Sequence, residues 1–137
     1  RTMQLVDEII EGIPIMGSVA AGGLIETYSD VQENLDISDV LKKKNVFALT
    51  VNGDSMIDAC IADGDMVLME PINYANSIRN GTIVSALVPG LGTTLKYFFK
   101  RGQNIHLEAA NSNYEPLILN QNEVIFQGKL LAVWRKV

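Results

Sequence analysis

The sequence predicts a mostly β protein, built from small, bent antiparallel sheets or a partly open barrel with one or two short helices. Runs of β-branched and aromatic residues recur along the chain and are bounded by Gly, Pro, Asn and Asp. Only two short stretches have helical character. The 137 residues, of which 47% are hydrophobic, suit a single domain with its own core.

Seven runs have strand character and follow one another at short intervals. The segment PGLG, residues 89–92, predicts a hairpin turn, and KRGQN, residues 100–104, separates the next pair of runs. Neighbouring strands are therefore expected to pair antiparallel. The seven runs are FALTVNG (47–53), DMVLMEP (65–71), GTIVSALV (81–88), TTLKYFFK (93–100), NIHLEA (104–109), EPLILN (115–120) and VIFQGKLLAVWRKV (124–137).

The two helical stretches are ISDVLKKKN, residues 37–45, and a short piece after Ser55. Ser38 is a candidate N-cap for the first. The last strand-like run, residues 124–137, is long and apolar. It fits two positions equally well: an edge that pairs across a two-fold axis, or a strand inside its own sheet.

Charge and composition exclude several classes of function. The net charge of −5 does not provide the basic surface that duplex DNA binding requires. One cysteine, Cys60, and one histidine, His106, are too few for a zinc site, and no cofactor is expected. No apolar run approaches the roughly 20 residues that cross a bilayer, and the N-terminal stretch lacks the pattern of a secretory signal. We expect a soluble, cytoplasmic protein without a membrane partner.

The stretch VNGDSMIDACIADGD, residues 51–65, raises a question about Ser55. Ser55 and Asp58 fit the S-x-x-D capping box, in which the serine only satisfies free amides of a helix. The same position also exposes a hydroxyl beside unpaired N–H groups, which are the donors an oxyanion hole needs. The local pattern does not distinguish whether Ser55 caps a helix or acts as a nucleophile.

A serine nucleophile needs a base. Alternation in NIHLEA places His106 on the face opposite Ile105 and Leu107, which predicts an outward-facing surface histidine. Lys96 lies in the middle of a predicted strand, on the face of Thr94. A mid-strand lysine usually reaches water. If Lys96 is buried instead, its pKa falls and its neutral amine can accept the proton of Ser55, although lowering a pKa by about three units costs about 4 kcal/mol of stability.

These residues together resemble a known family. The stretch 51–65, followed by NGTIVSALV, TTLKYFFK and LEAANSNYEPLIL, is similar to the C-terminal domain of LexA-type repressors. That family of self-cleaving Ser-Lys peptidases includes UmuD-type mutagenesis proteins and phage repressors. The resemblance runs from about Gly12 to the end of the chain. It implies that Ser55 attacks, that Lys96 activates it, and that backbone N–H groups at Asp54 and Ser55 form the oxyanion hole.

The resemblance also gives the small-residue segment GSVAAGG a role. The family cuts its own chain between a small residue and glycine, which implies the bond Ala21–Gly22 here. On composition alone, the same segment reads as an ordinary flexible connection. The family further implies a homodimer, a RecA filament on single-stranded DNA as activator, and operator DNA bound only through an N-terminal domain outside this sequence, hence a nucleoid-associated protein.

The expected organisation follows from this resemblance. Residues 1–12 are expected to be a linker and remnant of a DNA-binding domain, and residues 13–137 a self-cleaving and dimerising domain with its cleavage segment at 13–30. The start at Arg1, with Met3 close behind, fits either a fragment or a tag ahead of a natural start. A LexA-type repressor of the SOS response is favoured. The alternatives are a UmuD-like accessory protein of a translesion polymerase and a non-catalytic dimerisation module.

Overall fold

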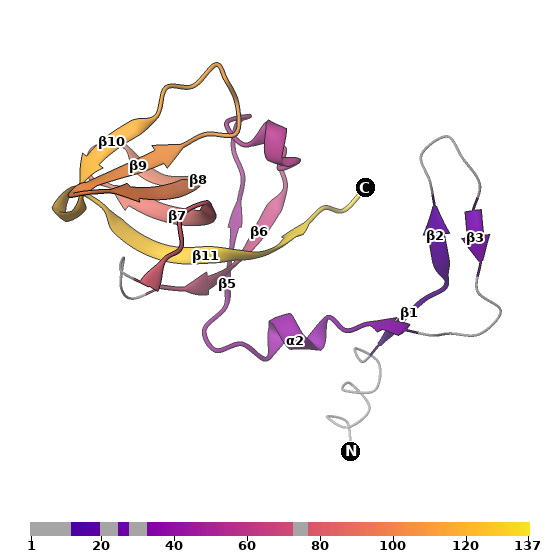
Figure 1. The fold of residues 1–137 in the computed structure, drawn as a ribbon. Coiled ribbons are helices and arrows are strands. Elements are labelled where there is room, and N and C mark those ends of the chain that lie inside the picture. The colour runs from indigo at the N-terminus through magenta and orange to yellow at the C-terminus, as the bar shows by residue number, and fades with distance from the viewer. Residues whose placement is uncertain (1–11, 20–24, 28–32, 73–76) are drawn as a thin grey trace. The chain divides into compact units, whose positions relative to one another are not determined.

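The computed structural model describes residues 12–19, 25–27, 33–72 and 77–137 of the chain. The chain divides into two compact units, Arg1–Lys43 and Lys44–Val137. Figure 1 shows the element order within each unit. The boundary expected between residues 12 and 13 adjoins residues outside the described part, so it stays a prediction.

The described residues of the first unit form two short antiparallel pairs and one helical turn. Strand β1 (Ile13–Ile15) pairs with β4 (Glu33–Leu35), and β2 (Gly17–Val19) pairs with β3 (Ile25–Thr27). The helix α2 (Ser38–Leu41) follows. Pairs of three-residue strands bury little apolar surface, so most of the core belongs to the second unit.

The prediction that Ser38 caps this helix is wrong. The N-cap position is Ile37, which carries no capping side chain, and Ser38 is the first helical residue. The carboxylate of Asp36 accepts the backbone N–H of Ser38 at 3.0 Å and also the Ser38 hydroxyl. The Ser38 hydroxyl thus donates to the Asp36 carboxylate, whereas the hydroxyl of a capping serine accepts an N–H of the first helical turn.

The second unit is a seven-stranded antiparallel sheet with strand order β10-β9-β8-β7-β11-β6-β5. The 3-10 helices η1 (Ile57–Ala59) and η3 (Gln121–Glu123) lie in described connections of this sheet. The predicted mostly β fold with open antiparallel sheets is confirmed. The strands are β5 (Phe47–Thr50), β6 (Met66–Pro71), β7 (Thr82–Val88), β8 (Gly92–Arg101), β9 (Asn104–Glu108), β10 (Leu117–Asn120) and β11 (Ile125–Trp134).

Strand β11 lies inside this sheet, which decides between the two positions left open by the sequence. Its first half pairs with β7 and its second half with β6, so the described sheet edges are β5 and β10. Register shifts interrupt β11 between Phe126 and Gly128 and between Leu130 and Ala132. Bulges of this kind bend a strand. They let β11 curve from one part of the sheet to the other, as Figure 1 shows.

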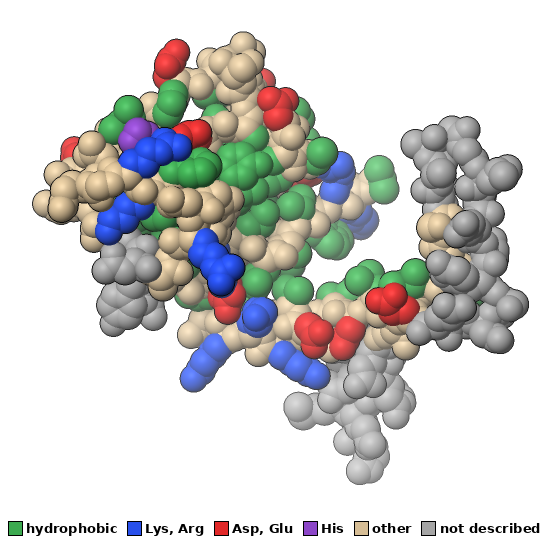
Figure 2. Space-filling view, in the orientation of Figure 1, with side chains coloured by type: hydrophobic (Ala, Val, Ile, Leu, Met, Phe, Trp, Pro, Cys, Tyr) green, Lys and Arg blue, Asp and Glu red, His purple; other side chains and the backbone are tan. Residues whose placement is uncertain are grey.

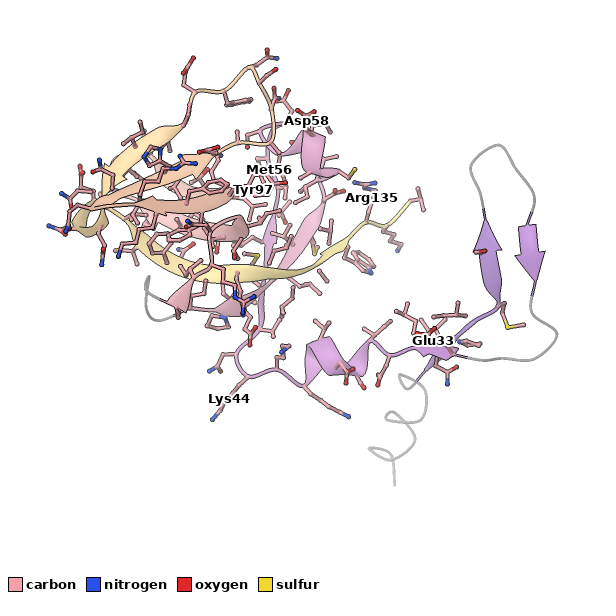
Figure 3. All side chains as sticks on the ribbon, viewed as in Figure 1. Glu33, Lys44, Met56, Asp58, Tyr97 and Arg135 are labelled. Atoms are coloured by element: carbon pink, nitrogen blue, oxygen red, sulfur yellow. The ribbon has the colours of Figure 1, made fainter. Side chains whose placement is uncertain are left out.

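The bent sheet encloses two apolar clusters. The first centres on Phe98, whose ring packs edge-on against Phe126 at 5.3 Å between centroids. The second centres on Met56, Ile61, Val67 and Met69, with Tyr97 packed against it. Figure 3 labels Met56 and Tyr97 within this region. Met56 immediately follows Ser55 and is 1% exposed, so the second cluster anchors the turn that carries the serine.

Candidate active site

The turn from residue 51 to residue 65 connects β5 to β6 and is closed at its base by main-chain hydrogen bonds. The Val51 N–H donates to the Asp65 carbonyl, and the Gly64 N–H donates to the Val51 carbonyl, both at 2.8 Å. Next to these contacts, the Gly53 N–H donates to the Asp63 carboxylate at 2.6 Å. Gly53 has φ +96°, a conformation that only glycine adopts without strain. The turn therefore holds Ser55 on a fixed support.

Ser55 does not cap the short helix that follows it. The N-cap of η1 is Met56, and no side chain makes a capping hydrogen bond there. The Ser55 hydroxyl instead accepts a hydrogen bond from Lys96 Nζ at 3.2 Å. The local pattern had left both roles open, and the tertiary contact with β8 is the one that forms.

Lys96 is half-buried in the middle of β8, and its amine is held by three oxygen atoms. Besides Ser55, Nζ donates to Thr94 Oγ1 at 2.6 Å and to the Leu95 carbonyl at 3.1 Å. An ammonium group has three N–H donors, so these acceptors match the protonated form. The predicted face shared by Thr94 and Lys96 is confirmed by their contact.

Burial lowers the pKa of Lys96 below its usual value, because desolvation disfavours the ammonium form. The three acceptors act in the opposite direction, since they bind the protonated amine. A lysine in this setting loses its proton more readily than one in water. It can then accept the proton of the adjacent hydroxyl.

A pocket of about 300 Å³ opens beside Ser55. One side is formed by the end of β5 and the turn, and the other by the start of β8. The wall is mixed, with aliphatic side chains and three threonines, and it carries no charged residue. Its lining residues are Leu49, Thr50, Val51, Asn52, Ser55, Met56, Val67, Thr93, Thr94 and Leu95.

The residue before the serine, Asp54, is held by the loop between β9 and β10. Asn111 Nδ2 donates to the Asp54 carbonyl at 2.9 Å, and the Tyr114 hydroxyl donates to the Asp54 carboxylate at 2.6 Å. The second hydrogen bond raises the pKa of Tyr114. Sequence reasoning named Asp54 only for its backbone and missed Asn111 and Tyr114. They lie 57 and 60 residues away, and no short-range pattern links them to the turn.

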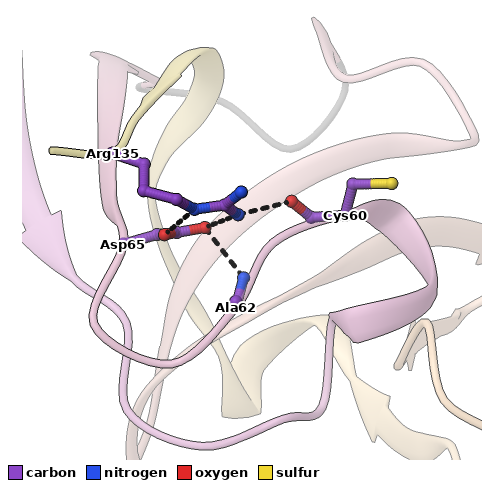
Figure 4. Close-up of polar contacts among 4 residues, drawn as sticks. All are labelled: Cys60, Ala62, Asp65 and Arg135. Carbon is purple, nitrogen blue, oxygen red and sulfur yellow. Dashed lines mark hydrogen bonds and ion pairs between the residues drawn. The ribbon is translucent and has the colours of Figure 1, made fainter. Parts of the chain in front are cut away.

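A second contact, which sequence reasoning did not predict, links the turn to the C-terminal tail. Arg135 donates to both carboxylate oxygens of Asp65, at 2.7 and 2.6 Å, and to the Cys60 carbonyl at 3.2 Å (Figure 4). The Asp65 side chain is 3% exposed and also accepts the Ala62 N–H at 2.8 Å. The hydrogen bonds from Arg135 lower the pKa of Asp65 to about 2.

The remaining predicted site residues lie elsewhere. Ala21 and Gly22 fall outside the described residues, between β2 and β3 in the sequence. His106, the purple side chain in Figure 2, lies on β9 with Nδ1 3.3 Å from Arg101 Nη1. Its neighbours Ile105 and Leu107 are fully buried, so the predicted alternation is confirmed. Among the described residues, His106 makes no contact with Ser55.

The described residues contain no cluster of three or more His, Cys, Asp or Glu side chains arranged to hold a metal ion. Within the same ranges, no helix is long and apolar enough to cross a membrane. On the face shown in Figure 2, the Lys and Arg side chains are dispersed among acidic and neutral ones and do not gather into one patch.

Residues 14–131 match the peptidase S24-like family. The chain is 40% identical over 125 residues to the LexA repressor of Koribacter versatilis (strain Ellin345), covering 91% of this chain and 58% of the relative. It is 38% identical over 143 aligned positions to the LexA repressor of Clostridium novyi (strain NT), covering 99% and 68%. With the LexA repressor of Clostridium tetani (strain Massachusetts / E88) it shares 43% over 126 residues, covering 90% and 60%. The chain thus spans 58–68% of the length of these curated relatives.

Proposed function

The chain belongs to the peptidase S24-like family, and from that premise we propose that it is the self-cleaving part of a LexA-type transcriptional repressor. Ser55 is the nucleophile, Lys96 is its base, and the bond between Ala21 and Gly22 is the substrate. The observation that carries the proposal is the 3.2 Å contact between Lys96 Nζ and Ser55 Oγ, at the edge of a pocket. This distance lies within the reach that proton transfer requires.

The reaction begins with neutral Lys96. Its amine takes the proton of Ser55, and Oγ attacks the Ala21 carbonyl carbon to form a tetrahedral intermediate. Backbone N–H groups at Asp54 and Ser55 stabilise the oxyanion. The Lys96 ammonium returns the proton to the Gly22 nitrogen as the peptide bond breaks. Water, deprotonated by Lys96, then hydrolyses the acyl-enzyme and regenerates Ser55.

The pocket and the sheet edge suit a peptide substrate. Strand β5 pairs only with β6 in the described sheet, so its other side presents free main-chain groups beside the pocket. An extended segment can add to such an edge through main-chain hydrogen bonds. The pocket wall has no charged residue, which fits the uncharged segment GSVAAGG.

The proposed biological consequence follows from the position of the cleavage site in the chain. Cleavage at residues 21–22 separates whatever domain precedes it from the dimerising part of the repressor. Two DNA-binding domains held on one dimer gain affinity from their linkage, and cutting removes that gain and derepresses the target genes. The names of the three relatives favour this role over a UmuD-like accessory function. A purely non-catalytic module would leave the Ser55–Lys96 contact without a role.

By the same family analogy, the activator is a RecA filament on single-stranded DNA, and the protein acts as a cytoplasmic homodimer. A filament promotes cleavage only if it binds the cleavable conformation more tightly than the idle one.

Alkaline incubation of the purified chain tests the chemistry without an activator. At about pH 10 more Lys96 is neutral, so intact-protein mass spectrometry is expected to show two fragments that meet at Ala21–Gly22. A Ser55→Ala variant should stay whole under the same conditions. A wild-type chain that stays whole, or a Ser55→Ala chain that is cut equally fast, would contradict the proposed function.

A further inference from the structure

The loop between β9 and β10 supports the serine turn at several points. Ala110 is the main anchor: its N–H donates to Met56 Sδ at 3.4 Å, and its carbonyl accepts the Asp58 N–H at 2.8 Å. These contacts flank Ser55 on its C-terminal side. Asn111 and Tyr114 hold Asp54 on its N-terminal side, at 2.9 and 2.6 Å. The loop therefore contacts both residues next to Ser55 in the chain, Asp54 and Met56.

The hydrogen bond from Asn111 fixes the plane of one particular peptide. It ends on the carbonyl of Asp54, whose peptide partner is the N–H of Ser55. No peptide bond in the described residues is cis, and in a trans peptide the carbonyl and the N–H point to opposite sides. With the carbonyl turned toward the loop, the Ser55 N–H points away from it. The residues that line the pocket beside Ser55 include none from that loop.

Asn111 is itself locked in the orientation that this contact needs. Its Oδ1 accepts the Asn113 N–H at 2.9 Å, which leaves Nδ2 as the group facing Asp54. The Asp54 carbonyl also accepts the Ile57 N–H, at a longer 3.2 Å. The Ser55 N–H donates no hydrogen bond within the described residues. This N–H is therefore available to a ligand. Its direction is set by the hydrogen bond that Asn111 makes to the Asp54 carbonyl of the same peptide group.

We propose that Asn111 is a positioning residue for self-cleavage, which orients the Asp54–Ser55 peptide so that the Ser55 N–H faces the developing oxyanion. This inference rests on the proposed function. Among the described residues, the Asn111 side chain makes its hydrogen bonds to Asp54 and Asn113, not to Ser55 or Lys96. It acts through the peptide, and Tyr114 assists by holding the Asp54 side chain. An oxyanion donor is effective only when it is aimed beforehand, since reorienting a peptide during the reaction raises the barrier.

Two variants separate this role from general support of the loop. Asn111→Asp keeps the acceptor for Asn113 but replaces the donor with an oxygen that repels the Asp54 carbonyl, and Asn111→Ala removes the side-chain amide without adding charge. The matched control is Asn113→Asp, which makes the same chemical change two residues away, where the side chain makes no hydrogen bond in the described residues. All three are compared with wild type across the alkaline pH profile.

Both Asn111 variants are expected to lower the plateau rate of self-cleavage about tenfold, which is the effect of losing one hydrogen bond. The pH at half-maximal rate should stay at the wild-type value, because Lys96 is unaffected. Asn113→Asp should cleave within about twofold of wild type. A wild-type plateau in both Asn111 variants, an equal loss in Asn113→Asp, or a displaced midpoint with an unchanged plateau would overturn the inference.

A second readout does not depend on cleavage. In a Ser55→Ala background, the carbonyl ¹³C resonance of Asp54 reports whether that oxygen is hydrogen-bonded, and it is expected to move upfield in both Asn111 variants but not in Asn113→Asp. An unchanged resonance would refute the inference even if cleavage slows. If the wild-type chain is never cut, the proposed function fails, while this resonance still decides whether Asn111 orients the peptide.

Discussion

Lys96 Nζ lies 3.2 Å from Ser55 Oγ, although 41 residues separate the two along the chain. The turn that carries Ser55 is fixed by the buried Met56, and Lys96 is fixed by the pairing of β8 with β7. Neither residue has to move far for a proton to pass between them. The rate of the proposed reaction should therefore depend on the protonation of Lys96 more than on any rearrangement of the pair.

The pH dependence of self-cleavage should report the lowered pKa of Lys96. The neutral amine is the active form, so the rate is expected to rise with pH and level off. Because burial lowers this pKa, the midpoint should fall below 10.5, the value for a solvated lysine. Cleavage rates measured by mass spectrometry across pH 7–11 test this expectation. A rate independent of pH in that range would mean that Lys96 is not the base.

Replacing Lys96 with arginine should abolish cleavage and leave the fold intact. A guanidinium stays protonated at every pH that the protein tolerates, so it cannot accept the serine proton. The rate at pH 10 should fall at least about 100-fold, which is the lower end of what a general base contributes. Lys129→Arg is the control, because Lys129 pairs with Glu70 at 3.7 Å and arginine keeps that charge. Circular dichroism should match wild type for both variants.

Thr94→Val should make the chain cleave at lower pH. The Thr94 hydroxyl accepts from Lys96 Nζ at 2.6 Å and so stabilises the ammonium form. Removing that acceptor lowers the pKa of Lys96, and the midpoint of the pH–rate profile should shift downward. Thr93→Val is the matched control, since Thr93 lines the same pocket but its hydroxyl contacts Gln127. An upward shift of the midpoint in Thr94→Val would contradict the assignment.

The ion pair between Asp65 and Arg135 should stabilise the fold at neutral pH and lose this effect in strong acid. The folded-state pKa of Asp65 is about 2, below the ordinary 3.8, so its contribution is complete above pH 3.8 and is lost as pH falls through 2. An Asp65→Asn variant should lack this part of the acid dependence. Thermal unfolding followed between pH 2 and pH 6 compares the two proteins, and parallel curves would contradict the prediction.

Arg135→Ala should lower Tm at pH 7 by several degrees, since it leaves the nearly buried Asp65 carboxylate without its guanidinium. Arg101→Ala is the control, because Arg101 meets Glu108 at the surface, with side chains 55% and 34% exposed. Pairs of that kind contribute little to stability. An equal decrease of Tm in the two variants would mean that burial of Asp65 does not make its ion pair more important for stability than a surface pair.

Gly128→Ala should destabilise the second unit by about 1–3 kcal/mol through overpacking. A Cβ at this position would lie 2.8 Å from Phe47 Cζ and 2.9 Å from the Glu70 carbonyl oxygen. Urea unfolding measures the loss. Gly102→Ala is the control: its φ of +64° is left-handed, but a Cβ there meets nothing within 4 Å, so only about 1–2 kcal/mol of backbone strain is expected. A Gly128→Ala protein as stable as wild type would show that the Phe47 ring and the β6 backbone can move away from β11.

Local patterns predicted the strand runs well, because alternation and turn residues are properties of neighbouring positions. PGLG forms the tight connection between β7 and β8, and all seven runs contain an observed strand. The same reasoning erred at Ser38, where the competing acceptor Asp36 lies outside the capping pattern. It did not decide whether β11 is an edge strand or a strand inside the sheet. Strand order depends on which other strands are available to pair, and the residues of one strand do not specify this.

The amino-acid sequence by itself determined which residues form strands, which serine sits on an exposed turn, and which lysine is unusual in its place. Only the folded chain decided that these two side chains meet, that burial lowers the pKa of the amine, and that Asn111 and Arg135 hold the turn from distant loops. The physical reason is the different range of the interactions along the chain. Backbone preference and alternation act over a few residues, whereas desolvation and hydrogen bonding between side chains depend on distances that long-range strand pairing sets.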